Sequence, residues 1–150
     1  MKESIAQNMT QEPIMVSPRV SLRETQEILQ IWGMRHLPVV DDDQRLIGVV
    51  SDRDIARAYS ARLPGTTAVT EFMTANPYCV FPHTSVGEVA EVMAENKYGC
   101  AIIVDAGSQV KGIFTTTDAL YVLARLLKRP EDSAFRVLNI ADYIRQRQVV

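Results

Sequence analysis

The heptapeptide Gly48-Val49-Val50-Ser51-Asp52-Arg53-Asp54 returns 64 residues later as Gly112-Ile113-Phe114-Thr115-Thr116-Thr117-Asp118. The same offset holds without a gap between residues 9–55 and 73–119, where 12 of 47 aligned positions are identical. Average residue usage would give roughly three identities. The chain therefore contains two copies of one structural unit, and two facing copies create a cleft that neither copy has alone.

Composition limits the classes of protein that the chain can represent. Its 150 residues can form one domain or two closely packed halves, which leaves no room for a separate catalytic domain. With 16 basic and 18 acidic side chains and no basic run, nucleic acid is not an expected partner. No stretch approaches 18 uninterrupted apolar residues, so neither membrane insertion nor secretion is predicted, and a cytoplasmic location is expected. Cys79 and Cys100 lie in apolar, strand-like runs and are expected to be buried rather than paired in a disulfide or metal site.

Each copy predicts the order strand, helix, strand, strand, helix. Ser21-x-x-Glu24 and Ser85-x-x-Glu88 have the spacing of capping boxes, so a helix is predicted to begin after each serine. The apolar residues of the first helix, Trp32 included, recur at helical spacing and are predicted to pack in the core. The predicted hairpins join 36–40 to 46–50 and 100–104 to 110–114; closing helices cover 55–61 and 119–127, and short lead-in helices cover 5–9 and 69–73.

The Ser/Thr-x-x-Asp segments admit two interpretations. Ser51 with Asp54, and Thr115 with Asp118, can serve only as helix caps, because a hydroxyl at the N-cap and an acid in the first turn satisfy free amides. A carboxylate at a strand-to-helix junction can also accept hydrogen bonds from a ribose diol, while nearby amides accommodate phosphate. Spacing alone favours the cap and leaves both interpretations open. The acidic run at 41–43 lacks the spaced ligands and closing Glu of a calcium loop, so no metal site is predicted.

The duplicated unit closely resembles the CBS domain, named after cystathionine β-synthase, and the tandem pair resembles a Bateman module. The resemblance rests on Arg35-His36-Leu37-Pro38-Val39-Val40, on the segment 48–54, and on their return 64 residues later. It implies an α/β (α+β) fold in which two β-α-β-β-α repeats are related by a pseudo-twofold axis. The corresponding boundaries are repeat 1 at 5–61, a linker at 62–68, repeat 2 at 69–127 and an amphipathic C-terminal extension at 128–150.

The resemblance also implies two clefts, in each of which the motif of one repeat meets the first strand and pre-hairpin segment of the other. Such modules bind adenosine-containing ligands, here AMP, ADP, ATP or S-adenosylmethionine, and need no obligatory cofactor. One cleft would combine Thr115 and Asp118 with Ile14, Met15, Val16, Arg35, His36, Pro38 and Arg53. The second, weaker cleft would combine Ser51 and Asp54 with Tyr78, Cys79, Val80, Gly99 and Ala101.

The two implied clefts differ in charge. In the family, phosphate contacts come from basic residues before the hairpin and from the residue before the motif Asp, which here are Arg35, His36 and Arg53. Guanidinium groups suit phosphate because their fork gives paired, charge-assisted hydrogen bonds. The second repeat has Gly99, Cys100 and Thr117 at these positions, with Lys97 as the nearest cation, and Ile102 replaces Pro38. Phosphate binding is therefore predicted in the Asp118 cleft.

Two functions remain after this reasoning. The first is a regulatory module that binds an adenine nucleotide, senses energy or metabolite levels, and acts through a conformational change on a protein partner. The second is a structural dimerisation module in which both motifs are only helix caps. No nucleophile elbow, metal-ligand spacing or Walker loop is present, so an enzyme is not predicted. A homodimer is predicted because the segment 119–127 carries apolar residues in excess, namely Leu120, Leu123, Leu126 and Leu127.

Overall fold

The computed structural model describes residues 3–128. It divides into two compact units, residues 1–119 and residues 120–150, and the first unit carries both sheets and all of the candidate site residues. The C-terminal extension predicted for 128–150 lies outside the described residues, apart from Lys128.

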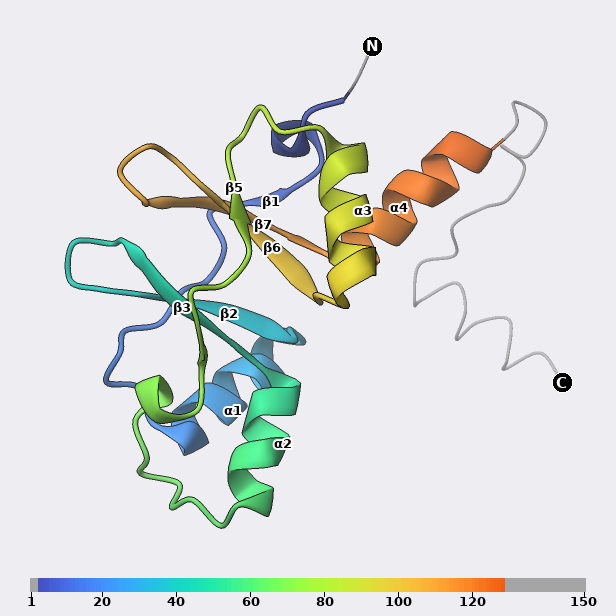
Figure 1. The fold of residues 1–150 in the computed structure, drawn as a ribbon. Coiled ribbons are helices and arrows are strands. Elements are labelled where there is room, and N and C mark those ends of the chain that lie inside the picture. The colour runs from blue at the N-terminus through green and yellow to red at the C-terminus, as the bar shows by residue number, and fades with distance from the viewer. Residues whose placement is uncertain (1–2, 129–150) are drawn as a thin grey trace, which may run out of the picture. The chain divides into compact units, whose positions relative to one another are not determined.

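The element order agrees with the duplication except at β5 (Figure 1), whose first-repeat counterpart is a single bridge between Val16 and Val39 instead of the expected strand. The first half holds the 3-10 helix η1 (Ile5–Gln7), β1 (Thr10–Gln11), α1 (Leu22–Trp32), β2 (His36–Val40), β3 (Leu46–Ser51) and α2 (Asp52–Ser60). The second half holds η2 (Val69–Glu71), β4 (Thr74–Ala75), β5 (Cys79–Val80), α3 (Val86–Asn96), β6 (Cys100–Val104), β7 (Val110–Thr115) and α4 (Thr116–Leu127). Both predicted hairpins are confirmed. The closing helices begin three residues earlier than predicted, directly after the motif Ser51 or Thr115.

The lead-in segments are exchanged between the two halves. The strand β1 pairs with β7 in the sheet β1-β7-β6-β5, whereas β4 pairs with β3 in the sheet β2-β3-β4. Close packing at the hairpin glycines permits this exchange: a Cβ on Gly48 would lie 2.5 Å from the sulfur of Met73, and a Cβ on Gly112 would lie 2.4 Å from that of Met9. Each sheet thus contains chain from both repeats.

The repeat symmetry extends to unusual backbone angles. Gly33 (φ 61°) and Lys97 (φ 57°) end α1 and α3 in the left-handed conformation, one repeat length apart as 97 − 33 = 64. Other left-handed residues pair in the same way, Glu12 with Asn76 and Gln44 with Ser108. Lys and Gln are not residues that favour this conformation. The backbone geometry is therefore imposed by the shared fold rather than by glycine content.

The two predicted capping boxes have different outcomes. At Ser21 the hydroxyl accepts the amide of Glu24 (3.2 Å), and the Glu24 carboxylate accepts the amide of Ser21 (2.8 Å), as predicted. Ser85 makes no side-chain cap, so that prediction was wrong. The Ser85 backbone has ψ 133° instead of the 162° of Ser21. The bridge from Ser85 to Ser4 does not explain the missing cap, because Ser21 makes the equivalent bridge to Ala68 and still caps. The first amides of α1 and α3 are also satisfied alike, by the carbonyls of Thr67 (2.8 Å) and Glu3 (2.9 Å).

The apolar core has a helix-facing part and a part between the two hairpins. Leu22, Leu29, Leu37 and Val50 belong to the first part, where α1 and α2 cover one face of β2 and β3 (Figure 1). Val49 joins the buried residues of β6 and β7 in the second part, and the Leu46 amide donates to the Ser108 carbonyl (2.9 Å) where the hairpin turns meet. The two repeats of the first unit therefore share buried surface.

Two predicted core residues lie outside the core. Trp32 is 63% exposed although its spacing from Thr25 and Leu29 places it on the buried face, because α1 ends at this residue, one turn beyond the last buried position. Cys79 is exposed in the short strand β5, whereas Cys100 is buried as predicted. Both cysteines are free thiols.

Candidate functional site

The Asp54 carboxylate has partners on both of its oxygens. Its Oδ2 accepts the Ser51 amide (2.8 Å) and the Ser51 hydroxyl (2.9 Å), and the Ser51 hydroxyl accepts the Asp54 amide in return (3.2 Å). Its Oδ1 accepts from the Arg57 guanidinium, which lies one helical turn further along α2. Asp54 is 3% exposed. The first-repeat motif is thus a capped helix start whose acid is also paired with a cation.

The Asp118 carboxylate repeats only half of this arrangement. Its Oδ2 accepts the Thr115 amide and hydroxyl, each at 2.8 Å, and the Thr115 hydroxyl accepts the Asp118 amide at 3.3 Å. Among the described residues, nothing donates to its Oδ1, and Asp118 is only half-buried. A carboxylate carries about four acceptor positions. This acid therefore keeps unused acceptor capacity that a ligand hydroxyl can reach.

The structure gathers the three basic residues predicted from the first repeat. The Arg35 carbonyl accepts the Asp52 amide (3.1 Å), which holds the pre-hairpin segment against the start of α2. Arg35 and Arg53 are exposed, and within residues 3–128 neither guanidinium is in an ion pair. Burial lowers the pKa of His36. The negative charges of Asp52 and Asp54 oppose this effect, and the positive charges of Arg35 and Arg53 lower the pKa further. Two unpaired cations therefore lie within electrostatic range of one imidazole.

His36 also touches the second repeat. A Cβ on Gly99 would lie 2.5 Å from its Nε2, so the imidazole packs directly on the glycine that replaces Arg35 in the second repeat. The charged groups that act on His36 are Arg35, Asp52, Arg53 and Asp54; Asp118 is not among them in the described chain. His36 thus faces the residues assigned to the second cleft as well as the basic cluster.

The Asp54 carboxylate of the first repeat lies near residues of the second repeat. Burial, with a smaller contribution from the Asp54 carboxylate, raises the pKa of the Cys100 thiol to about 12, which places the motif acid near the start of β6. Tyr78 stacks on Tyr98 with ring centroids 5.5 Å apart. Burial raises the pKa of the Tyr78 hydroxyl, and Glu88 adds to the effect. This side of the molecule presents an aromatic pair and a buried thiol.

Several predicted wall residues are buried. Val16 is 7% exposed and pairs with Val39 of β2, and its amide donates to the Pro38 carbonyl (3.0 Å). Pro38 and Ala101 are fully buried in β2 and β6. Side-chain contact between these residues and a ligand would require the strand segments to part. Met15, Val80, Ser51 and Thr115 remain half-buried and reachable.

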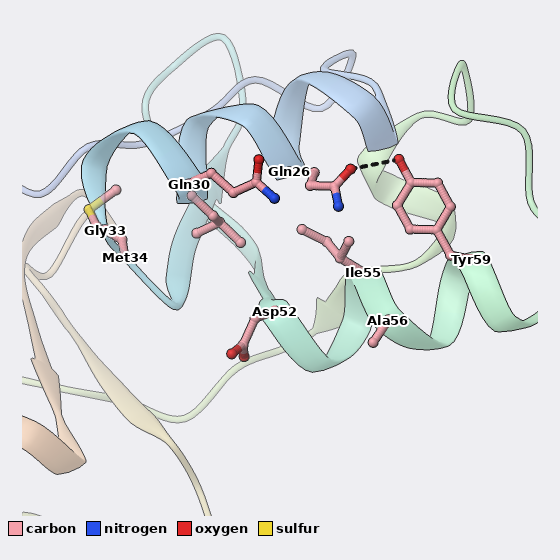
Figure 2. Close-up of a pocket in the computed structure, with 9 residues that line it drawn as sticks. Gln26, Gln30, Gly33, Met34, Asp52, Ile55, Ala56 and Tyr59 are labelled. Carbon is pink, nitrogen blue, oxygen red and sulfur yellow. Dashed lines mark hydrogen bonds between the residues drawn. The ribbon is translucent and has the colours of Figure 1, made fainter.

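A separate groove lies between α1 and α2 (Figure 2). Its volume is about 330 Å³, and the Tyr59 hydroxyl donates to the Gln26 amide oxygen (3.0 Å) across it. Asp52 is the one motif residue on its rim, and Ile31 and Trp32 are exposed on α1. This groove was not predicted from the sequence. Its wall on α1 includes the polar residues Gln26 and Gln30 beside the apolar Leu29.

The acidic turn at 41–43 is explained by local contacts. The Asp41 carboxylate accepts the amides of Asp43 and Arg45, both at 2.9 Å, and Asp42 forms an exposed ion pair with Arg19 at 3.2 Å. Across residues 3–128, no group of three His, Cys, Asp or Glu side chains could hold a metal ion. In the same range, no helix has both the length and the apolar character needed to cross a membrane.

Sequence reasoning missed Arg57. Its spacing from Asp54, three residues along a helix, is the spacing at which side chains of opposite charge meet, so the pair could have been found from the sequence. Tyr121 occupies the equivalent position in the second repeat, as 121 − 57 = 64. The two motifs therefore differ one turn beyond the residues that define them.

Comparison with known proteins assigns the fold to a family. The CBS domain family matches residues 3–61 and 69–125, which together make up more than half of the chain. The chain belongs to the CBS domain family, and it carries two tandem copies of the domain.

Two solved structures share the fold along most of the chain. The CBS domain pair of protein MJ0100, in complex with 5′-methylthioadenosine and S-adenosyl-L-methionine, is 25% identical with a TM-score of 0.79, over 84% of this chain and 99% of that one. CBSX2 from Arabidopsis thaliana, in complex with AMP, is 26% identical with a TM-score of 0.75, over 83% and 98% of the two chains. Both neighbours therefore hold adenosine-containing ligands.

Curated relatives match over part of their length. The inosine-5′-monophosphate dehydrogenase of Korarchaeum cryptofilum is 30% identical over 108 residues, which are 72% of this chain and 22% of that enzyme. The chain spans only 21% to 25% of the length of the first curated relatives that it matches. The likeness to the dehydrogenase covers the CBS part of this chain.

Proposed function

We propose that this CBS pair is a regulatory, non-enzymatic module that binds an adenosine-containing ligand, AMP, ADP, ATP or S-adenosylmethionine. The observation that carries the proposal is the Asp118 carboxylate, which is half-buried and has an oxygen without a protein donor in the described chain. The unpaired Arg35 and Arg53 add a counter-charge for phosphate. The adenosyl ligands of MJ0100 and CBSX2, which share the fold, give independent support.

The proposed binding mode follows from the chemistry of each group. The ribose hydroxyls donate to Asp118 beside Thr115, because a charged acceptor strengthens such hydrogen bonds. Arg35 and Arg53 hold the phosphate, with His36 as an additional polar group. The adenine lies against the apolar segment of Met15, Val16 and Pro38, which must part from its neighbours to admit the ring.

That need for the strands to part links binding to a change in shape. A ligand can shift the packing of the two repeats only if it binds one packing state better than the other. We propose that a protein partner senses this shift and that the module acts in the cytoplasm. We also propose that the module is a homodimer. Ile31 and Trp32 of α1, exposed by 77% and 63%, give a dimer apolar surface to bury.

Thermal unfolding with and without ligand tests the proposal. At one hundred times its dissociation constant, a ligand adds about 2.7 kcal/mol to the free energy of unfolding. We expect the melting temperature to rise with at least one of AMP, ADP, ATP and S-adenosylmethionine, and to rise much less in Asp118→Asn. Unchanged melting curves with all four compounds would reject the binding function.

A second candidate function is a structural dimerisation module. The hydrogen bonds between each motif acid and its Ser51 or Thr115 partner favour this function as well, because they are sufficient to cap the two helices without any ligand. Light scattering separates the two functions when it is combined with the melting curves. A dimer that responds to none of the ligands supports the structural module, and a monomer at micromolar concentration would reject the dimer itself.

A further inference from the structure

The two motif acids differ in how much of each carboxylate is available. In Asp54 both acceptor positions of Oδ2 are taken by Ser51, and Oδ1 accepts from Arg57. The side chain of Asp54 is only 4% exposed, so little of its carboxylate is open to a ligand while the ion pair with Arg57 holds. In Asp118 the Ser51 role is filled by Thr115, and Oδ1 remains open within the described chain.

A ribose diol needs a carboxylate oxygen with room for its hydroxyl donors. At Asp54 the Arg57 guanidinium already donates to the same oxygen that a ribose would use. The guanidinium also carries a full positive charge, so it is a stronger donor to a carboxylate than a neutral hydroxyl is. Ribose binding at Asp54 would therefore have to share Oδ1 with a charged partner or displace it, whereas binding at Asp118 would not.

The difference is encoded at one position of the repeat. Arg57 aligns with Tyr121, and a phenol cannot form the ion pair that the guanidinium forms. His36 also takes up space near the Asp54 carboxylate, because its imidazole lies on Gly99 and within electrostatic range of Asp54. Two side chains of the first repeat thus face the residues that would form the second cleft.

We infer that Arg57 closes the Asp54 cleft by acting as an internal substitute for the ligand, so that each chain binds one adenosine-containing molecule, at Asp118. This inference rests on the proposed function of the Asp118 cleft. Arg57 is itself mostly exposed, with 76% of its side chain accessible, so it can move away without disturbing the core. The closed cleft is consequently latent rather than absent.

The latent cleft selects a particular class of ligand when it opens. The second repeat supplies Gly99, Cys100 and Thr117 where the first supplies Arg35, His36 and Arg53. The positions that the family uses for phosphate are therefore neutral in the second repeat. The Asp54 cleft without Arg57 should take an adenosine that lacks phosphate, and adenosine itself is the suitable probe.

The test compares four proteins by isothermal titration with adenosine and with AMP. They are the wild type, Arg57→Ala, Arg57→Gln, and the matched control Arg19→Ala, which breaks an exposed ion pair with Asp42 on the β2–β3 turn. Arg57→Gln keeps most of the side-chain volume and guards against a folding defect in Arg57→Ala. Melting temperatures without ligand verify that each variant is folded.

We expect the wild type and Arg19→Ala to bind one adenosine per chain, and both Arg57 variants to bind two. In the Arg57 variants, the affinity of the Asp54 cleft for adenosine should be about tenfold or more above that of the same cleft in the wild type, which corresponds to one charged hydrogen bond. Adding Asp54→Asn to either variant should remove this second site. AMP should remain at one per chain throughout.

The outcomes separate this inference from the proposed function. One site in the wild type and one in both Arg57 variants would overturn the inference and leave the Asp118 site standing. Two sites in the wild type would overturn the inference as well. No site in the wild type with one in the Arg57 variants would support the role of Arg57 and reject Asp118, and no site in any of the four proteins would reject both.

Discussion

The two strand-to-helix junctions of this chain start from the same sequence pattern and end with different chemistry. At both junctions a hydroxyl residue and an Asp three positions later form the same pair of reciprocal hydrogen bonds. At the first junction the remaining carboxylate oxygen is taken by Arg57, and at the second it is open within the described chain. Cap formation is therefore a property of the motif, whereas availability for a ligand is a property of its neighbours.

The comparison also explains why duplication is useful to such a fold. Two copies with one backbone geometry can specialise through a few side chains, because the shared cap keeps each helix start in place. In the proposed binding mode, one copy supplies the cations Arg35 and Arg53, and the other supplies the open acid Asp118. Division of labour between repeats then needs no change in the main chain.

Replacing each motif acid by its amide gives the sharpest test of this difference. We expect Asp118→Asn to weaken nucleotide binding by on the order of 1.5 to 3 kcal/mol, because a charged acceptor is lost. Asp54→Asn should instead lower the free energy of unfolding, since it removes a buried charge from an ion pair and leaves nucleotide affinity nearly unchanged. Calorimetry for binding and urea unfolding for stability give the two readouts, and equal binding losses in both variants would remove the asymmetry.

Gly48 and Gly112, the two hairpin glycines, have equivalent surroundings, so substitutions at them should lower the stability of the protein to a similar extent. Besides the methionine sulfurs, a Cβ would meet the Thr74 carbonyl at 3.0 Å from Gly48, and the Thr10 carbonyl at 2.9 Å from Gly112. Backbone cannot move aside as a flexible side chain can, so Gly48→Ala and Gly112→Ala should each cost about 1 to 3 kcal/mol of stability by overpacking. Urea unfolding measures both, and Gly107→Ala on an open turn is the matched control. A large difference between the two variants would show that the lead-in exchange is not symmetric.

Sequence reasoning predicted the repeated framework better than the contents of the clefts. The 64-residue offset was enough for the hairpins and the lead-in helices, because hydrophobic spacing and turn residues act locally. The missing cap at Ser85 could not be predicted, since Ser21 and Ser85 share the Ser-x-x-Glu spacing and a bridge from a lead-in segment, yet only Ser21 caps its helix. The exposure of Trp32 depends on where a helix ends relative to its neighbours, which periodicity does not encode.

The candidate site divides in the same way. The pairing of each motif acid with its hydroxyl follows from spacing alone and was expected. The contact between His36 and Gly99 joins residues that are distant in the sequence, and only the packing of one repeat on the other brings them together. Cleft residues such as Pro38 and Ala101 remain predictions, because the structure buries them in the sheets.

His36 makes the comparison sensitive to pH, because the second repeat has Cys100 at its position. Burial lowers the pKa of His36 in the folded state, and the charges of Arg35 and Arg53 add to this effect, whereas those of Asp52 and Asp54 oppose it. The unfolded chain therefore binds the proton more tightly, and stability should be fully present above the ordinary pKa of 6.5 and fall as the pH drops below it. Urea unfolding between pH 5 and pH 8 should show less of this fall in His36→Gln. An identical pH profile for both proteins would mean that His36 does not titrate against folding.

The smallest expected effect concerns the exposed Arg53. If Arg53 holds a phosphate in the Asp118 cleft, Arg53→Ala should weaken AMP binding by about 0.2 to 1 kcal/mol, the range of exposed ion pairs, and leave adenosine binding unchanged. The same substitution should flatten the dependence of AMP affinity on salt, because an exposed charge pair is screened at physiological ionic strength. Thr117, the residue at this position in the second repeat, provides the matched control as Thr117→Ala. Calorimetry at low and high salt measures both effects. If AMP and adenosine respond alike to Arg53→Ala, Arg53 only decorates the first turn of α2, and the cations no longer distinguish one cleft from the other.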